Sequence, residues 1–292
     1  MLSGLAQGSF QATARAAAFA VAALSLSSVV PSAALAAPEA ELWPRWQAHD
    51  PAAKQTIDHT AWDRILRTYI VPDGGINYFA YGKVSEGDRA ALSGYVDALA
   101  NTPISRFGRD EQLAYWVNLY NALTIELILE HGPVKSIRDI DISPGLFSFG
   151  PWDKTLITVE GEALTLNDIE HRILRPIWRD PRIHYAVNCA SIGCPNLQDQ
   201  AFTGANAEAL LEAGARAYIN HPRGARVEGG ALTVSSIYDW FSEDFGDDDA
   251  AIIAHLKRYA EPPLREALEG IREIDDDEYD WRLNAPRAAS TS

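Results

Sequence analysis

The sequence predicts an α+β fold, in which a buried central helix and further helices pack on a small, hairpin-built, mainly antiparallel sheet. Three observations predict this fold. Residues 113–131 are apolar on nearly every side of a helix, which is typical of a helix buried in a core. Segments 154–166 and 225–234 carry β-forming residues on both sides of a glycine-containing turn, as β-hairpins do. Helices and hairpins occupy separate stretches, which favours α+β over an alternating parallel sheet.

The first 36 residues have the organisation of a secretory signal peptide. One basic residue, Arg15, precedes a small apolar run at 16–30, and Ala34-Leu35-Ala36 fits the cleavage site. This run is shorter than the roughly 20 apolar residues of a membrane span, although an uncleaved anchor helix is the alternative. The sequence therefore predicts a mature protein that begins at Ala37 and is periplasmic or secreted.

The composition of the mature chain indicates one acidic globular body. Residues 37–292 suit one large domain or a domain with a helical preface, and the full chain is 47% hydrophobic with eight Trp residues. The net charge of -15 argues against nucleic acid and anionic lipid as partners, because both are negatively charged. No second apolar span follows, so no stable membrane span is expected after signal cleavage.

The elements up to the central helix are mostly helical. Residues 41–70 and 86–101 are predicted helices on either side of the turn-rich VPDGGINY, so 37–104 is expected to be an N-terminal helical segment. The central helix, 113–131, has Asp110 as a candidate cap and ends at Gly132-Pro133.

A hairpin, a helix and a strand are expected next. Hairpin 154–166 leads into a helix over 166–175, where Thr165 and Asp168 have the spacing of a capping box. The segment RIHYAVNC, 182–189, is predicted to be a strand because it is rich in β-branched and aromatic residues.

The C-terminal part repeats the order of hairpin and helix. Hairpin 225–234 precedes a helix over 235–241, for which Ser236 and Asp239 are the candidate capping box. A last helix over 245–260 begins among Asp residues. Residues 286–292 are small and polar and predict a disordered tail.

Two amides are expected to be buried in the central helix. Asn118 and Asn121 lie three residues apart, on one face of it. An unpaired buried amide costs about 1–3 kcal/mol, so both need hydrogen-bond partners. They either hold a neighbouring loop or strand in place, or line a polar cavity and orient a ligand or a catalytic histidine.

One carboxylate is predicted to point into the core from helix 166–175. At about 100° per residue, Glu170 falls inside an apolar stripe, whereas His171 lies to the side of it. A buried carboxylate must be paired or its pKa rises. Glu170 is therefore a candidate catalytic residue, and a structural salt bridge to an arginine such as Arg182 is the alternative.

The predicted strand separates its side chains into two rows. His184 and Asn188 share one face, and Cys189 lies on the other if the strand stays regular. A Cys189–His184 dyad is therefore disfavoured without a bulge, and His171 is another possible base. A purely structural role for His184 is the alternative.

The segment NCASIGCPNL contains both cysteines of the chain, Cys189 and Cys194. In an exported chain, two cysteines predict a disulfide, and Ser191, Gly193 and Pro195 allow the required turn. A nucleophilic cysteine, a redox pair and a zinc clip remain as alternatives. C-x4-C is not the C-x-x-C of disulfide oxidoreductases, and two cysteines fall short of four zinc ligands. No phosphate loop or H-E-x-x-H is present, so neither a cofactor nor a metal is predicted.

Five segments, in this order, resemble the DUF547 family: YWVNLYNALTI, LTLNDIEHRILRP, DPRIHYAVNCASIGCPNL, LTVSSIYDWFSEDF and YDWRLN. The resemblance covers roughly residues 105–285. The biochemical role of this family is largely undefined. The resemblance therefore implies a fold family and no reaction.

Two functional hypotheses follow. The first is an exported cysteine-dependent hydrolase or transferase that acts on peptide-like substrates. The candidates for its site are Cys189 or Cys194 as nucleophile, His184 or His171 as base, and Asn118, Asn121, Asn188 and Glu170 as groups that bind or orient. The second is a non-catalytic envelope binding or assembly module for a small-molecule or peptide ligand, with a structural disulfide. Buried polar groups need partners, so Glu170, His184 and one of the two amides are expected to approach one another, with the cysteine loop at the rim.

Overall fold

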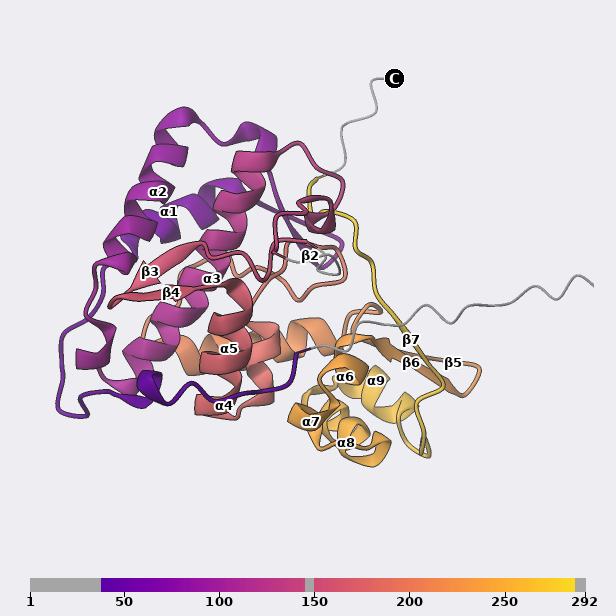
Figure 1. The fold of residues 1–292 in the computed structure, drawn as a ribbon. Coiled ribbons are helices and arrows are strands. Elements are labelled where there is room, and N and C mark those ends of the chain that lie inside the picture. Colours follow the sequence, from indigo (N-terminus) through magenta and orange to yellow (C-terminus); the bar gives the residue numbers. More distant parts are fainter. Residues whose placement is uncertain (1–37, 145–149, 287–292) are drawn as a thin grey trace, which may run out of the picture. The chain divides into compact units, whose positions relative to one another are not determined.

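The computed structural model describes residues 38–144 and 150–286 (Figure 1). The predicted signal peptide, 1–36, and all of the predicted tail except Pro286 lie outside the described residues. In the described part, no helix combines the length and the apolar character that crossing a membrane requires.

The described residues form helices of very different lengths. The α-helices are α1 (Thr60–Tyr69), α2 (Glu86–Ala100), α3 (Arg109–His131), α4 (Arg175–Trp178), α5 (Ala207–Ile219), α6 (Ile237–Trp240), α7 (Ser242–Phe245), α8 (Asp249–Tyr259) and α9 (Pro262–Ala267). Other helical turns are η1 (Pro44–Gln47), η2 (Tyr81–Lys83), η3 (Ile104–Arg106), η4 (Ile137–Asp139), η5 (Asp168–Leu174) and η6 (Pro181–Tyr185), of which η5 is a π-helix and the others are 3-10 helices.

The strands form three small sheets. They are β1 (Ile70–Asp73) with β2 (Ile76–Phe79), β3 (Ile157–Val159) with β4 (Glu162–Leu164), and β5 (Ala225–Glu228) with β6 (Ala231–Ser235) and β7 (Asp276–Glu278). All pairs are antiparallel except β6–β7, which is parallel. The α+β prediction is confirmed. The expected single sheet is replaced by separate ones, and β7 lies in an acidic run that the sequence did not predict as a strand.

Helix α3 is the buried central helix, as predicted, and Figure 1 shows it among α2, α4 and α5. It begins at Arg109, four residues before the predicted start, and Gly108 rather than Asp110 is its N-cap. Its end before Pro133 is as predicted, because proline cannot continue a helix. Nearly all of its side chains from Gln112 to Ile128 are buried.

The long N-terminal helix predicted at 41–70 is wrong. Only η1 and α1 are helical there, and the residues between them, which include Pro51, are not. Proline lacks the N–H that a helix interior needs. Helix 86–101 is confirmed as α2, and its cap is Ser85, whose hydroxyl accepts a hydrogen bond from Asp88 N at 3.1 Å.

The helix predicted at 166–175 has a wider turn than expected. Thr165 and Asp168 form the predicted capping box, with Thr165 N to Asp168 Oδ2 and Asp168 N to Thr165 Oγ1 both at 3.0 Å. The π-helical turn of η5 then shifts the helical phase. As a result His171 is buried together with Glu170. Regular helical periodicity of about 100° per residue had predicted that His171 lies beside the apolar stripe rather than within it.

The strand predicted at 182–189 is wrong, because η6 occupies its first half. The Asp180 carboxylate accepts a hydrogen bond from Arg182 N at 2.9 Å, and Pro181 occupies the first helical position, which suits proline. Helix initiation therefore outweighs the β-forming residues that follow. The predicted alternation of side chains, which separated His184 from Cys189, does not apply.

In the C-terminal part, hairpin 225–234 is confirmed as β5–β6. Helix α8 is also confirmed, with the Asp248 carboxylate accepting from Ala251 N at 2.8 Å. The capping box expected for 235–241 is absent, because the Ser236 side chain makes no cap hydrogen bond at α6.

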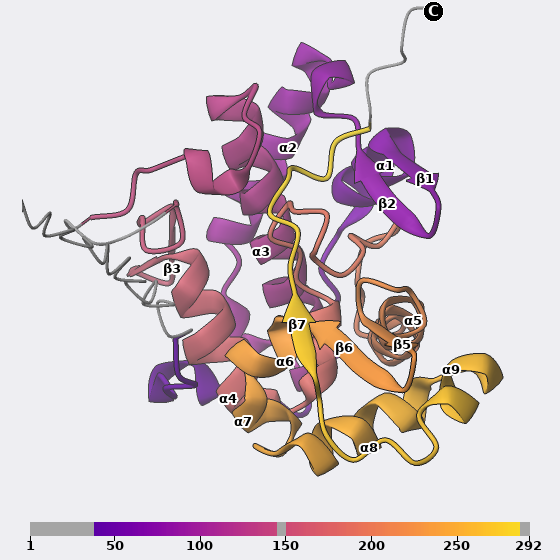
Figure 2. The ribbon, with the colours of Figure 1, turned by 90° about the vertical axis from the view of Figure 1, so that its right-hand side faces the viewer.

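Figure 2 shows β7 beside β6 and the chain continuing from β7 toward β2. There Phe79 N donates to Asn284 O at 2.8 Å.

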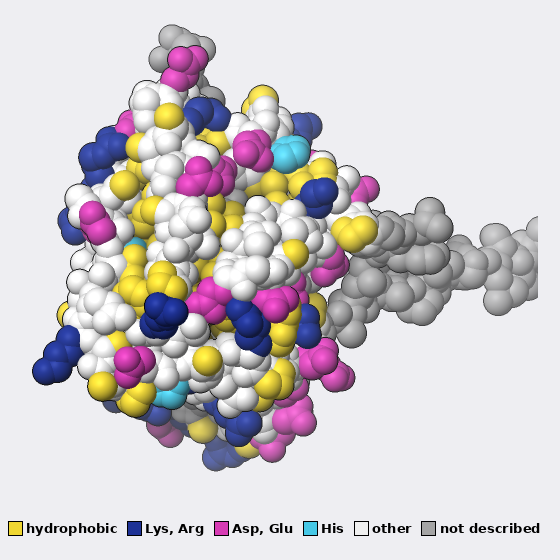
Figure 3. Space-filling model, turned by 60° about the vertical axis from the view of Figure 1, so that its left-hand side comes forward, with side chains coloured by type: hydrophobic (Ala, Val, Ile, Leu, Met, Phe, Trp, Pro, Cys, Tyr) yellow, Lys and Arg dark blue, Asp and Glu magenta, His cyan; other side chains and the backbone are white. Residues whose placement is uncertain are grey.

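The buried hydrophobic side chains form a larger cluster around α1, α2 and α3 and a smaller one around β5, β6 and α8. Lys and Arg side chains are interspersed with Asp and Glu on the face drawn in Figure 3. That face therefore presents mixed charge despite the net charge of -15.

Candidate functional site

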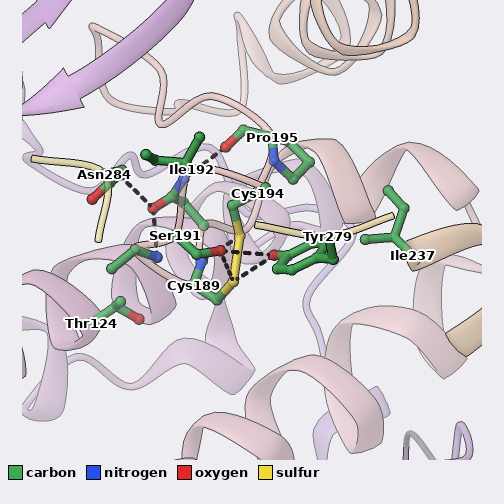
Figure 4. Close-up of a disulfide and its surroundings, with 12 residues drawn as sticks. Thr124, Cys189, Ser191, Ile192, Cys194, Pro195, Ile237, Tyr279 and Asn284 are labelled. Carbon is green, nitrogen blue, oxygen red and sulfur yellow. Dashed lines mark hydrogen bonds between the residues drawn. A yellow bond between two sulfur atoms is a disulfide. The ribbon is translucent and has the colours of Figure 1, made fainter. Parts of the chain in front are cut away.

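The two cysteines form a disulfide in the loop that follows η6 (Figure 4). Their Cα atoms are 6.2 Å apart, within the usual range for such a bond. Cys189 is half-buried, whereas Cys194 is 4% exposed. We refer to residues 188–197 as the Cys loop. In the part of the chain that the structure describes, no group of three or more His, Cys, Asp or Glu residues could hold a metal ion.

The Cys loop is paired along its backbone with the C-terminal segment 280–284. The hydrogen bonds run from Ile192 N to Arg282 O (2.8 Å), from Gly193 N to Asp280 O (2.8 Å) and from Asn284 N to Ala190 O (3.0 Å). A Cβ atom at Gly193 would lie 2.7 Å from Asp280 N, so this close approach requires glycine. The loop is thus held as an irregular strand.

Two long side chains hold the same loop from the other side. The Tyr218 hydroxyl donates to Gly193 O at 2.6 Å. The Arg223 guanidinium donates to Ile192 O at 2.9 Å and to Asn196 Oδ1 at 2.6 Å. Burial lowers the pKa of Arg223, and none of the described carboxylates forms an ion pair with it. An arginine charge is therefore kept beside the loop without a carboxylate to neutralise it.

Two buried amides fix the start of the Cys loop. Asn121 donates to Ala186 O at 2.9 Å and accepts from Asn188 N at 2.8 Å. Asn188 in turn donates to Pro195 O at 2.7 Å and accepts from Ala190 N at 2.9 Å. These bonds cross-link both ends of the loop to α3, independently of the disulfide.

The other predicted amide also binds backbone. Asn118 donates to Phe202 O at 2.8 Å and accepts from Phe202 N at 3.0 Å. Asn118 and Asn121 therefore hold neighbouring segments in place, the first of the two alternatives for them. Among the described residues, neither amide is hydrogen-bonded to Glu170 or His184, so the approach of an amide to that pair stays a prediction.

The Cys189 sulfur contacts two hydroxyl groups. Tyr279 Oη lies 3.1 Å and Ser191 Oγ 3.4 Å from it, and Ser191 donates to Tyr279 Oη at 2.9 Å (Figure 4). Burial raises the pKa of Tyr279, so its hydroxyl stays protonated and can donate to sulfur. The backbone N–H of Cys189 lies 2.9 Å from the sulfur of Cys194. Each sulfur therefore has a hydrogen-bond donor of its own.

The residue after Cys189 has a strained backbone. Ala190 has a φ of 58° and is fully buried. A non-glycine residue in the left-handed region costs roughly 1–2 kcal/mol. Such strain persists only where the surroundings impose it, and it is concentrated at functional sites.

A second polar arrangement, which we call the ionic cluster, comprises Glu170, His171, Arg175, His184 and Asp244. Asp244 Oδ2 accepts from His184 Nε2 at 2.6 Å and from Arg175 Nε at 2.5 Å. His184 Nδ1 lies 3.7 Å from Glu170 Oε1. The exposed fractions of Glu170, Arg175 and His184 are 7%, 3% and 4%, so these side chains interact in a largely water-free environment.

Within the ionic cluster, His171 is held in its neutral form. Burial lowers its pKa to about 4, and the Arg175 charge acts in the same direction. Its Nδ1 lies 3.0 Å from Arg175 Nη1, a contact in which neutral His171 accepts. The His171 and His184 rings both stack on Phe241, at centroid distances of 5.6 and 4.4 Å. Stacking and hydrogen bonds together fix both imidazoles.

The predicted proximity of Glu170 and His184 is confirmed by their 3.7 Å separation. The alternative partner for Glu170 is wrong, because Arg182 pairs with Asp180 at 2.7 Å and with Glu208 at 2.7 Å. The catalytic roles of these residues stay predictions.

The ionic cluster and the Cys loop are linked through tyrosines. The Glu170 carboxylate contributes to raising the pKa of Tyr120 and of Tyr279, in both cases after burial, which is the larger cause. Tyr279 is also the residue that contacts the Cys189 sulfur. Glu170 therefore affects Tyr279 only through its charge, because no hydrogen bond among the described residues joins Glu170 to Tyr279 or His184 to either cysteine.

Half-buried aromatic rings surround Tyr279. Its ring centroid lies 4.7 Å from Trp240 and 4.7 Å from Trp281. The exposed Arg138 guanidinium lies 5.1 Å from the Trp281 ring, a cation–π contact. Flat aromatic surface beside a reactive group is a common way to bind part of a ligand.

Sequence reasoning missed three residues of this site: Asp244, Arg175 and Tyr279. Asp244 and Tyr279 lie far along the chain from the cysteines and the histidines. Both occur in the quoted segments LTVSSIYDWFSEDF and YDWRLN, so those motifs carried the signal.

A shallow hollow of about 400 Å³ lies elsewhere, at the start of α3. Its lining includes His49, Lys54 and Arg109. No residue of the Cys loop or of the ionic cluster lines it, so it does not belong to the candidate site.

Comparison with known proteins identifies a similar family but no reaction. Residues 104–219 match the model of a family described as a protein of unknown function, DUF547. Residues 104–219 are therefore similar to the DUF547 family, as the resemblance had indicated. The match includes α3, η5, the Cys loop and α5, whereas the segments 232–245 and 279–284 follow it. No curated protein and no solved structure matches the chain.

Proposed function

We propose that the protein is an exported enzyme that uses the reduced form of Cys189 as its nucleophile, as a hydrolase or transferase on peptide-like substrates. The observation that carries the proposal is the contact of the Cys189 sulfur with Tyr279 Oη at 3.1 Å and Ser191 Oγ at 3.4 Å. Hydroxyl donors stabilise a thiolate, which is the reactive form of cysteine. The unneutralised Arg223 charge beside the loop acts in the same direction.

The chemical step is an acyl transfer. The Cys189 thiolate attacks a carbonyl carbon of the substrate, a C–S bond forms, and the C–N or C–O bond to the leaving group breaks. The leaving group takes a proton from the Tyr279 hydroxyl, which lies 3.1 Å from the Cys189 sulfur, and water returns a proton to Tyr279. Water or an acceptor nucleophile then attacks the thioester and releases Cys189. Asp244 orients His184 through the 2.6 Å hydrogen bond.

The experiment combines chemical reduction with a peptide-like activated ester as the probe. Reduced wild-type protein is expected to form an acyl adduct at Cys189, located by intact mass and peptide mapping. Cys189→Ser loses the adduct, and Cys194→Ser, the matched control, keeps it. An adduct that is absent, or that forms equally on both cysteines, removes the enzyme proposal.

The second candidate is a non-catalytic envelope binding or assembly module. One observation favours it: the buried amides and the disulfide together fix a loop near the half-buried rings of Trp240 and Trp281. Such a module binds its small-molecule or peptide ligand equally well after Cys189→Ala, provided that the loop stays folded. Ligand-induced change of Trp fluorescence in both forms tests this candidate.

A further inference from the structure

The two sulfurs of the disulfide differ in their surroundings. Cys189 is half-buried and has hydroxyl donors, whereas Cys194 is 4% exposed and faces the Cys189 N–H. An attacking thiolate can approach only the accessible sulfur, and exchange is faster when the other sulfur leaves as a stabilised thiolate. The asymmetry therefore defines an entry sulfur, Cys189, and a leaving sulfur, Cys194.

The fold does not depend on this disulfide to hold the loop. Backbone pairing with 280–284, the Tyr218 and Arg223 side chains and the amides of Asn121 and Asn188 all hold it. A disulfide that closes so short a loop restricts the unfolded chain only weakly. Reduction can thus occur with the sulfurs still in place, which distinguishes this bond from one that supports the structure.

We infer that the Cys189–Cys194 disulfide oxidises a dithiol-containing peptide or protein by thiol–disulfide exchange. The inference goes beyond the proposed function and shares with it the reacting sulfur, Cys189. A thiolate of the partner attacks Cys189 Sγ and forms a mixed disulfide. The Cys189–Cys194 bond breaks, and its electron pair leaves with Cys194 Sγ, which the Cys189 N–H stabilises.

The second thiolate of the partner then completes the reaction. It attacks the partner's own sulfur in the mixed disulfide and releases Cys189 as a thiolate beside the Tyr279 hydroxyl. The partner gains a disulfide, the chain becomes a dithiol, and two electrons pass from partner to chain. The Cys189–Cys194 disulfide is then regenerated by exchange with a second disulfide compound, which is reduced. The reduced product is the form in which Cys189 is free to act as a nucleophile.

The first test compares the folded chain with its own loop in isolation. Oxidised wild-type protein and the oxidised linear peptide of residues 188–197 are each mixed with a reduced two-cysteine peptide. Mass spectrometry of quenched samples is expected to show the folded chain reacting about tenfold faster or more, because its leaving thiolate is stabilised. An equal or slower rate overturns the inference.

The second test assigns the sulfurs. Cys194→Ser is expected to trap a mixed disulfide at Cys189 with a single-cysteine peptide disulfide, whereas Cys189→Ser, the matched control, reacts at least about tenfold more slowly. Equal trapping at both positions contradicts the assignment. Tyr279→Phe should slow the wild-type exchange, and an unchanged rate removes Tyr279 from the mechanism. The exchange rate of the wild-type protein relative to the loop peptide still tests the inference if a variant fails to fold.

The two proposals fail separately. Exchange without an acyl adduct removes the hydrolase or transferase and leaves a dithiol oxidant. An acyl adduct after strong chemical reduction, with exchange no faster than in the peptide, removes the inference and leaves the enzyme.

Discussion

The Cys loop and the ionic cluster are both buried and polar, but different interactions hold them. Backbone groups, amides and hydroxyls hold the Cys loop, and the charged side chain that binds it, Arg223, forms no ion pair with a described carboxylate. The ionic cluster depends on charges, with Asp244 shared by His184 and Arg175. Neutral hydrogen bonds change little with pH, whereas buried charges are sensitive to protonation and to the loss of a partner. The loop should therefore tolerate acid and the cluster should not.

The largest effect is expected from Arg175→Ala. The Arg175 side chain is 1% exposed and pairs with Glu243 at 2.6 Å and Asp244 at 2.5 Å. Its removal takes the buried cation away from the half-buried Asp244 carboxylate, at a cost of about 3–5 kcal/mol in the free energy of unfolding. Urea denaturation measures the loss. Arg226→Ala is the matched control, since its partner Glu278 is exposed, and should cost less than about 1 kcal/mol. Similar losses in both variants would contradict the comparison.

The second effect is a loss of stability in acid. His171, whose pKa is lowered to about 4, is neutral in the folded chain, whereas the unfolded chain takes up the proton near pH 6.5. The unfolded state therefore binds more protons between these values, so stability falls as pH drops from 6.5 to 4.

Asp244 extends the loss to lower pH. Burial alone would raise its pKa, but the hydrogen bonds and charges of His184 and Arg175 lower it below the usual value. Its contribution is present above the unfolded pKa of 3.8 and disappears as pH falls through the folded value. Melting temperatures between pH 7 and about 2 should show both declines, that of His171 first and that of Asp244 at lower pH.

The variant His171→Gln tests the origin of the acid effect. It should reduce the slope of melting temperature against pH between 6.5 and 4. A residual slope is expected, because burial also lowers the pKa of His59 and His255 to about 4. His131→Gln, at the exposed end of α3, is the matched control. An identical slope in wild type and His171→Gln would show that the ionic cluster does not cause the acid sensitivity.

Within the Cys loop, Asn188→Ala is expected to be the most damaging change. It removes the partners of Pro195 O and Ala190 N, both buried, at a cost of about 3 kcal/mol. Chemical denaturation at pH 7 measures the change. Asn101→Ala, an exposed amide at the end of α2, should stay within about 0.5 kcal/mol of wild type.

The smallest effect is expected from loss of the disulfide itself. The double variant Cys189→Ala, Cys194→Ala should lose no more than about 2 kcal/mol, because the loop it closes is short. It should keep the near-ultraviolet circular dichroism of wild type. A loss larger than that of Asn188→Ala would mean that the disulfide, rather than the amides, holds the loop.

The sequence predicted the elements that depend on local signals. The hairpins at β3–β4 and β5–β6, the capping box of Thr165 and Asp168, and the burial of α3 follow from turn chemistry and periodicity. The predictions from the sequence were wrong where another interaction outweighed the local signal. The Asp180-Pro181 start turned a β-rich segment into η6, and the π-helical turn of η5 changed the phase that separated Glu170 from His171.

The candidate site was predictable only in part for a related reason. Glu170 and His184 could be paired because each was a buried polar group in need of a partner. Asp244 reaches His184 across 60 residues of chain and Tyr279 reaches Cys189 across 90, and no periodicity reports contacts at such separations. The amides bound backbone instead, because backbone donors and acceptors are more numerous than side-chain partners in a core.

The pairing of the Cys loop with residues 280–284 also sets an order of events during synthesis. Both cysteines leave the ribosome long before Tyr279, which lies 90 residues beyond Cys189. Until then the loop has neither its neighbouring strand nor its hydroxyl donor, so its thiols are those of an unfolded chain. Oxidation at that stage joins the cysteines while the loop is still loose, and the later arrival of the C-terminal segment encloses a bond that already exists. The reactivity of these sulfurs is therefore acquired in the last stage of folding.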